Sequence, residues 1–524
     1  MAENDYFDAV VVGAGMAGSI VAGRLAERGV NPKTGDRLRV ALIEGGDDWT
    51  IRDPGLRPGY GYPIRRQMLT NINYEENGPE GDEPGPDFRW YYAGENFKLV
   101  GGCSVHWGAN AFLPVEDDFE QYRLASGVDW TYGKFYDSLE EVKEIMHVRP
   151  DPEGTWTKGI RMFTAAGRAM GYDMQPIMVA RRNCLDSRYC GDGHICRYDS
   201  KGTGLPWIYI GMNNGLTVIP NAEVEKVVIE KPSGSAPVAT GVVYKDKSGA
   251  MHQVRAARVI VACGASGTAC LLYKSGYGPR EVLGNDLIVE NKNVGQHLDG
   301  DCSSGISAYF PEDITPATQG GTGYTWTTMK PRPWGELNVQ IWAKELARNH
   351  YPHTAALSSF SPEFGWKHKE YMRSAVRRIG VIVNRLQLLP WKWKVTRDGR
   401  MERVSLDEQK INATLKEAAE LTYSWYEKME VKPIEIDRRV RPATAFRPGH
   451  NSGTARAGAS RDVSVCSSDF DCHDIDHLMI TSGASMPRTT FCHGGCPIAM
   501  GGAYAWRRIL TNHFSKGSST KGYA

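Results

Sequence analysis

The chain has 524 residues, enough to bury a large core and to form two or more structural units. Its 62 basic and 61 acidic residues leave a net charge of +1, which gives no electrostatic basis for binding nucleic acid or an anionic membrane. The eleven cysteines form an odd, scattered set, as expected in a reducing compartment. We find no basic, apolar leader and no apolar run long enough to span a bilayer, so we expect a cytoplasmic protein.

A glycine turn near the N-terminus joins an apolar strand to a helix. Residues 8–18 read DAVVVGAGMAG, and a helical pattern follows over residues 19–26. In such a turn Gly13 permits the tight bend, Gly15 lets a pyrophosphate approach the backbone, and Gly18 lets the helix pack on the strand. The helix N-terminus then faces the phosphates. The pattern predicts a dinucleotide-binding turn.

A second strand supports this interpretation. Residues 38–43 (LRVALI) are followed by Glu44, where a carboxylate can accept hydrogen bonds from a ribose. The polar segment 31–36 is interpreted as a loop that lengthens the usual interval between turn and carboxylate. A third apolar strand ends in a glycine turn at Gly264, with a helical pattern over 268–273, and we expect it in the same sheet.

Three further stretches have a clear local character. Residues 51–95 are rich in Pro, Gly and Tyr and are interpreted as a long excursion that carries function or covers a site. Gly101 and Gly102 again let backbone approach a ligand closely. Residues 134–147 have the spacing of an amphipathic helix.

The middle of the chain differs in composition from the ends. Over residues 301–448, tryptophans recur among polar, strand-like stretches, and we expect a half-exposed antiparallel sheet that covers the nucleotide-binding part. A carbohydrate or aromatic substrate could stack on such rings, but ordinary packing is the favoured explanation. The tryptophans concerned are Trp326, Trp334, Trp342, Trp366, Trp391 and Trp393.

A family resemblance emerges in the C-terminal third. Residues 449–458 read GHNSGTARAG, residues 476–487 read DHLMITSGASMP, and residues 491–500 read FCHGGCPIAM. Together with the N-terminal turn, VGGCSVHWG at 100–108 and VIVACGASGTACLLYKSG at 259–276, the sequence resembles the glucose-methanol-choline flavin oxidoreductases. It is most similar to pyranose and other sugar-type oxidases and to bacterial FAD-dependent sugar dehydrogenases. The resemblance is weak across residues 300–445.

This resemblance implies an α/β fold, with a Rossmann-like FAD-binding domain and a second, substrate domain built on an antiparallel sheet. The FAD-binding domain is expected to be discontinuous and to comprise residues 1–50, 96–150, 215–300 and 449–524. The substrate-binding domain and cover loops are expected to comprise residues 51–95, 151–214 and 301–448.

The resemblance also implies a catalytic pair. His450 matches the family's catalytic base, and His493, six positions after Pro487, matches its partner, where sugar-type members mostly carry Asn. Alcohol oxidation by hydride loss independently requires a base for the hydroxyl proton, and histidine titrates near neutrality. A second side chain on the same hydroxyl would orient the C–H bond. The alternative is that both are ordinary polar residues at glycine-rich turns.

By the same resemblance, FAD is the cofactor. His106 matches the position where fungal pyranose oxidases attach FAD covalently, although related bacterial dehydrogenases hold FAD there without the bond, which is the favoured case. The residues expected to contact the cofactor are Gly13, Gly15, Gly18, Glu44, Gly101, Gly102, Ser104, His106, Gly264, Gly483 and Ala484.

Three cysteines form a candidate metal site. Cys184, Cys190 and Cys196 resemble the three-cysteine loop that carries a 3Fe–4S cluster in the large subunits of bacterial glucose and fructose dehydrogenases, although the second interval is longer here. Three structural thiols, or a disulfide pair plus one thiol, are slightly favoured over iron–sulfur ligands.

The sequence therefore predicts FAD-dependent oxidation of a primary or secondary alcohol, with a sugar or glycoside as the favoured substrate and oxygen or another acceptor taking the electrons. Aryl or steroid-like alcohols are alternatives. A non-redox lyase that uses the same histidine and a flavin-binding module without catalysis also remain open. A nicotinamide dehydrogenase is least favoured, because only one strong dinucleotide turn is found.

Overall fold

A computed structural model describes residues 6–48, 98–105, 107–183, 200–314, 325–328, 339–345, 363–433, 448–489 and 494–515. Its first sheet has seven strands in the order β6-β2-β1-β9-β8-β7, and β20 also pairs with β9. The pairs β6–β2, β2–β1, β1–β9 and β9–β20 are parallel, and β7–β8–β9 is antiparallel. The strands are β1 (Tyr6–Val12), β2 (Val40–Ile43), β6 (Thr217–Ile219), β7 (Ala222–Glu230), β8 (Val238–Asp246), β9 (Met251–Val261) and β20 (Leu478–Ile480).

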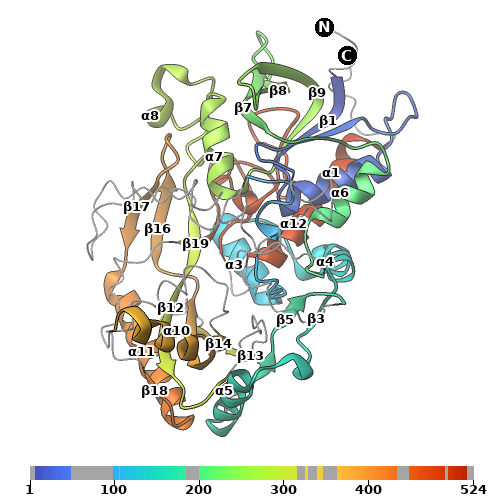
Figure 1. Cartoon of the computed structure of the whole chain (residues 1–524). Helices are drawn as coiled ribbons and strands as arrows, with labels where there is room; N and C mark the ends of the chain where they lie inside the picture. Colours follow the sequence, from blue (N-terminus) through green and yellow to red (C-terminus); the bar gives the residue numbers. More distant parts are fainter. Residues whose placement is uncertain are drawn as a thin grey trace.

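Helices cover this sheet and bury its central strands. α1 (Met16–Arg28) packs against α6 (Leu205–Met212) and α12 (Gly495–His513), while α7 (Gly264–Lys274) contacts β7 (Figure 1). Gly23 makes the close α1–α6 contact possible, because a Cβ there would lie 2.1 Å from the Trp207 carbonyl oxygen. The predicted strand, glycine turn and helix are confirmed, and the third predicted strand does join this sheet as β9.

The second sheet is antiparallel. Its order is β18-β12-β15-β14-β13-β4, and β19 also pairs with β12. Figure 1 shows β12, β13 and β14 at the opposite end of the molecule from β1, β8 and β9. The strands are β4 (Gln175–Pro176), β12 (Asp299–Tyr309), β13 (Thr325–Thr328), β14 (Val339–Glu345), β15 (Ile379–Leu386), β18 (Lys432–Pro433) and β19 (Gly449–Ser452).

The expected antiparallel sheet is thus present in the middle of the chain. Helices α5 (Lys158–Ala169) and α11 (Glu408–Lys428) pack on it, and the buried Trp425 of α11 donates its Nε1–H to the Phe163 carbonyl oxygen at 2.9 Å. The tryptophans of β16 (Trp391–Val395), which pairs with β17 (Met401–Leu406), are also buried, with ring centroids 5.8 Å apart. Trp391 and Trp393 therefore serve packing rather than stacking on a substrate.

The remaining elements connect these layers. The predicted amphipathic helix is α4, which begins two residues before the expected start. Among the described helices, none combines the length and apolar character needed to cross a bilayer. The other elements are α3 (Glu116–Ser126), α4 (Tyr132–Met146), α8 (Arg280–Leu283), α10 (Gly365–Arg378), β3 (Val148–Pro150), β5 (Met178–Ala180), β10 (Tyr277–Gly278), β11 (Val289–Glu290), and the short helices η4 (Gly102–Val105), η5 (Glu153–Thr155), η6 (Gly284–Asp286) and η8 (Gly483–Ser485).

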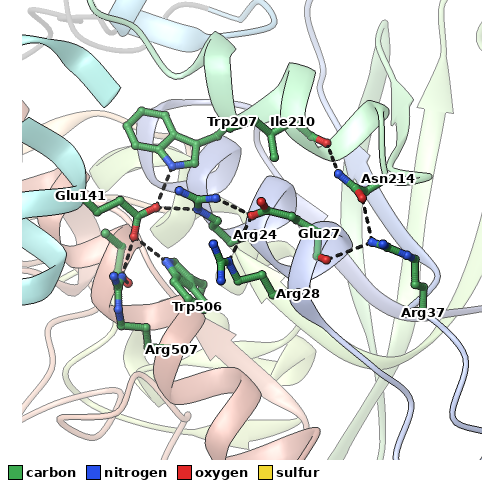
Figure 2. A network of polar contacts seen from close by, with 11 residues as sticks. Arg24, Glu27, Arg28, Arg37, Glu141, Trp207, Ile210, Asn214, Trp506 and Arg507 are labelled. Atoms are coloured by element: carbon green, nitrogen blue, oxygen red, sulfur yellow. Dashed lines mark hydrogen bonds and ion pairs between the residues drawn. The ribbon is translucent and has the colours of Figure 1, made fainter. Parts of the chain in front are cut away.

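A buried carboxylate joins four of the helices. Glu141 of α4 accepts hydrogen bonds from Arg24 of α1 (2.6 Å), Trp207 of α6 (3.0 Å), and Trp506 and Arg507 of α12 (3.1 and 2.6 Å) (Figure 2). Burial raises the pKa of Glu141, but the hydrogen bonds from Trp207 and Arg24 and the nearby cations outweigh burial and hold the pKa below its ordinary value. This network fixes the position of α12, which begins two residues after His493 in the sequence.

Candidate active site

The turn between β1 and α1 is shaped by contacts that exclude side chains. Gly13 has a φ of +99°, and a Cβ on Gly18 would lie 1.9 Å from the Gly13 carbonyl oxygen. A Cβ on Gly15, by contrast, would meet no protein atom within 4 Å, so the space beside the helix N-terminus is open. An open space beside the first N–H groups of a helix suits a pyrophosphate.

Glu44 lies at the carboxyl end of β2, beside this turn. One carboxylate oxygen accepts the Ala14 N–H at 2.8 Å and the other accepts the Gly46 N–H at 2.9 Å. Burial raises the pKa of Glu44 to about 7, although these two hydrogen bonds act in the opposite direction. The remaining acceptor capacity of the carboxylate suits a ribose hydroxyl.

The Gly101–Gly102 segment lies directly against the turn. The Gly101 N–H donates to the Ala14 carbonyl oxygen at 2.9 Å, and a Cβ on Gly102 would lie 2.7 Å from the Cα of Gly15. Ser104 donates its hydroxyl to the Gly101 carbonyl oxygen at 2.5 Å and accepts the Gly204 N–H at 2.9 Å. Ser104 thereby holds the segment in place, and its contact with a cofactor stays a prediction.

The other predicted cofactor residues meet where α7 begins. Gly264 opens α7 with a φ of +70°, and a Cβ on Gly483 would lie 2.8 Å from the Asn451 carbonyl oxygen. The Ala455 N–H donates to the Ala484 carbonyl oxygen at 3.0 Å. These contacts hold η8 and the residues after β19 together, close to the first sheet.

His450 lies on β19, which pairs with β12 of the second sheet. Its Nδ1 is 2.9 and 3.1 Å from the two carboxylate oxygens of Asp301. The Asp301 side chain is 1% exposed and the His450 side chain 31% exposed, so a buried acid holds an accessible imidazole. The φ of His450 is +50°, a conformation that costs energy for a side chain with a Cβ. His450 lies where the β12–β19 register shifts, between the paired residues Gly449 and Ser452.

Several predicted site residues lie outside the described residues: His106, His493, Cys184, Cys190 and Cys196. The described neighbours of the two histidines are nevertheless close to each other. A Cβ on Gly494 would lie 3.4 Å from the Cβ of His450, and a Cβ on Gly495 would lie 2.5 Å from the Trp107 ring. Gly494 therefore lies beside His450, and Trp107 lies beside Gly495. Among the described residues, no cluster of three His, Cys, Asp or Glu side chains could hold a metal ion.

Sequence reasoning missed two acids of β12. Asp301 holds His450, and Asp299 accepts the Thr489 N–H at 3.2 Å and the Trp391 Nε1–H at 3.2 Å. Residues two apart on a strand point to the same face. The signal was present as two aspartates two residues apart at the start of a strand, LDGD, but their partners are far away in sequence.

Comparisons with known proteins agree with this architecture. The GMC oxidoreductase N-terminal model matches residues 7–298 and the C-terminal model matches residues 353–502. The chain is 27% identical to (R)-mandelonitrile lyase 2 of Prunus dulcis, over 59% of this chain and 51% of the relative. It is 25% identical to the fructose dehydrogenase large subunit of Gluconobacter japonicus, over 51% of this chain and 53% of the relative.

A solved structure matches nearly the whole chain. The crystal structure of pyridoxine 4-oxidase from Mesorbium loti superimposes with a TM-score of 0.70 at 16% identity, covering 97% of this chain and 99% of that one, which shows the fold. The matches to the two curated relatives span only about half of each relative's length. The two family models nevertheless cover most of this sequence, and the chain belongs to the GMC oxidoreductase family.

Proposed function

We propose that the chain binds FAD and oxidises a primary or secondary alcohol to a carbonyl compound, with His450 as base and His493 as its partner. A sugar or glycoside is the favoured substrate class. The observation that carries the proposal is the accessible imidazole of His450, held at Nδ1 by buried Asp301. Membership of an oxidoreductase family supports it.

The described residues suit FAD. Space beside Gly15 and the N-terminus of α1 would accept the pyrophosphate, and Glu44 would accept hydrogen bonds from the ribose. When bound, FAD supplies the atom that accepts the hydride leaving the carbinol carbon. The remaining predicted contacts, at Gly101, Gly102, Gly264, Gly483 and Ala484, come from segments that adjoin the turn or the start of α7.

His450 would take the hydroxyl proton of the alcohol at Nε2. As this O–H bond breaks, the electron pair forms the C=O bond and the hydride departs with two electrons from the same carbon. His450 becomes a cation beside the Asp301 carboxylate, which stabilises it. His493 would hydrogen-bond the same hydroxyl and orient its C–H bond. Oxygen or another acceptor must then remove the two electrons.

Anaerobic mixing tests this function. The FAD-reconstituted protein is mixed with D-glucose, D-fructose, methyl glucoside, benzyl alcohol or a 3-hydroxysteroid, and the visible flavin band is followed. Bleaching by a sugar supports the favoured substrate, and bleaching by another alcohol alone supports the aryl or steroid alternative. The absence of bleaching by any of these alcohols would contradict the proposed oxidation.

A lyase is the second candidate, because (R)-mandelonitrile lyase 2 is among the relatives. The same experiment with (R)-mandelonitrile separates the two candidates. A lyase releases benzaldehyde while the flavin band stays unchanged, whereas an alcohol oxidoreductase releases none and is bleached by its alcohol.

The same preparation can be used to determine the electron acceptor, whether FAD is covalently bound, and whether an iron–sulfur cluster is present. Hydrogen peroxide formed in air indicates oxygen as the acceptor, and reduction of an added dye alone indicates a dehydrogenase. Acid precipitation should leave FAD in the supernatant, whereas colour in the pellet would point to a bond through His106. A broad absorption shoulder lost on acidification would identify Cys184, Cys190 and Cys196 as cluster ligands, an outcome that we do not favour.

A further inference from the structure

We propose that Asp301 is the positioning residue for His450: it fixes the proton on Nδ1, presents Nε2 as the base, and stabilises the cation formed when Nε2 takes the substrate proton. The proposal rests on the proposed function, since it gives His450 a working partner within that same site.

The tautomer follows from the chemistry of the contact. An ionised carboxylate only accepts hydrogen bonds, and a neutral imidazole has one N–H donor and one acceptor nitrogen. Nδ1 lies 2.9 and 3.1 Å from the two Asp301 oxygens, so with Asp301 ionised it is Nδ1 that carries the hydrogen and donates it. Nε2 is then the acceptor nitrogen, as a general base requires.

Strand pairing brings Asp301 and His450 together. Asp301 pairs with Gly449 across the β12–β19 ladder, so backbone pairing places the carboxylate beside the next residue of β19, His450. The hydrogen bond at Nδ1 then restricts rotation about the side-chain torsions of His450. A base aligned in this way loses less entropy when it meets the hydroxyl group.

Within the described part of the chain, Asp301 is the charged residue shown in contact with the His450 imidazole. α7 and η8 also pack on β19, and their only charged residue is Lys274, at the far end of α7. Burial lowers the pKa of nearby His297 to about 3, so His297 is neutral at working pH. Among the other charged residues on neighbouring segments, Arg488 pairs with Asp299, Lys274 with Glu225 and Lys394 with Glu402. Two further cations, Arg456 and Lys392, act on His297.

Asp301→Asn is the informative substitution, because Asn keeps an acceptor oxygen and removes the negative charge. An opposite charge within hydrogen-bond distance favours the protonated imidazole, so its loss should move the protonation midpoint of His450 to lower pH by about one unit. The rate of flavin reduction should fall about tenfold or more at neutral pH. Asp301→Glu, which keeps the charge, should return the midpoint toward the wild-type value.

The midpoint can be measured without a substrate. Diethyl pyrocarbonate reacts with neutral imidazole, and the accessible side chain of His450 can be followed by peptide mass spectrometry across a pH series. His252, whose Nε2 lies 2.7 Å from Asp246, is an internal control from a distant His–Asp pair on β8 and β9. The expected result is a shift for His450 and none for His252.

An unchanged His450 midpoint in Asp301→Asn would overturn the proposal, even if alcohol oxidation is confirmed. If that variant does not fold, ¹⁵N NMR of the wild-type holoenzyme decides, with His450→Gln assigning the resonance: a proton on Nδ1 in the neutral form supports the proposal, and a proton on Nε2 contradicts it. Failure of the proposed function itself would appear separately, as the absence of flavin bleaching by every alcohol.

Discussion

Two regions of the molecule assemble the site by different means. The β1–α1 turn uses residues close together in sequence, and what it offers a ligand is backbone N–H groups and space at Gly15. The β12–β19 contact joins Asp301 to His450 across 149 residues and offers charged and titratable side chains. The geometry of the turn is thus encoded locally by steric exclusion, whereas the Asp301–His450 contact depends on tertiary pairing. Substitutions should separate the two.

The largest effect is expected from Gly18→Ala in the turn. The new Cβ would lie 1.9 Å from the Gly13 carbonyl oxygen, a backbone atom that cannot move without displacing α1 from β1. We expect a loss of at least about 3 kcal/mol of stability or no folded protein. This loss can be measured by thermal unfolding of the apoproteins of the variant and the wild type.

Gly15→Ala is the matched control in the same turn. Its Cβ would meet no protein atom within 4 Å, so the apoprotein should unfold within a few degrees of the wild type while its affinity for FAD falls. Wild-type FAD affinity in Gly15→Ala would place the pyrophosphate elsewhere.

Glu141→Ala tests the helix network that positions α12. It removes the carboxylate shared by Arg24 and Arg507 and leaves Arg24 with Glu27 as its carboxylate partner, at a cost of about 2–3 kcal/mol. Because the pKa of Glu141 lies below its ordinary value, this stabilisation is present at neutral pH and is lost only as the pH falls through that lowered pKa.

The control for the network is Glu223→Ala. Its ion pair with Lys98 is exposed, so the expected loss is below about 1 kcal/mol. Equal shifts of the thermal midpoint in Glu141→Ala and Glu223→Ala would show that the helix network does not fix α12.

A smaller, pH-dependent effect is expected from Glu44→Gln. Burial raises the pKa of Glu44 from 4.5 to about 7, so the folded apoprotein binds this proton more tightly than the unfolded chain does. The free energy of unfolding should therefore decrease as the pH rises from about 4.5 to about 7, by about 3 kcal/mol at most. Glu44→Gln should flatten this slope and weaken FAD binding about tenfold. If thermal unfolding of Glu44→Gln depends on pH as steeply as that of the wild type, Glu44 is not the group responsible for this pH dependence.

The sequence predicted the first region in more detail than the second. The turn at Gly13, Gly15 and Gly18 and the strand that ends before Glu44 were predicted correctly, because a tight turn and a strand end impose local requirements that individual residues reveal. The cofactor contacts of these residues stay predictions. The start of α7 was predicted four residues too late. Gly264 begins the helix with a positive φ, and a search for helical periodicity does not detect this conformation.

For the second region, the sequence predicted only an antiparallel sheet over residues 301–448, with His450 following it in the chain. Asp301 could not be found, because its partner is defined by the register of β12 against β19 and not by spacing along the chain. Trp391 and Trp393 could not be assigned to the core from composition alone, since burial depends on the packing of β16. The steric requirements of a local turn can therefore be inferred from the sequence, whereas the register between strands far apart in the chain is known only from the structure.

The most direct test of the account is the rate constant of anaerobic flavin reduction in His450→Gln, measured with the alcohol that bleaches the wild type fastest. The variant should still bind FAD, because the β1–α1 turn and Glu44 are unchanged, and its flavin reduction should be about 100- to 10,000-fold slower. A reduction rate equal to that of the wild type would show that His450 is not the base and would contradict the account.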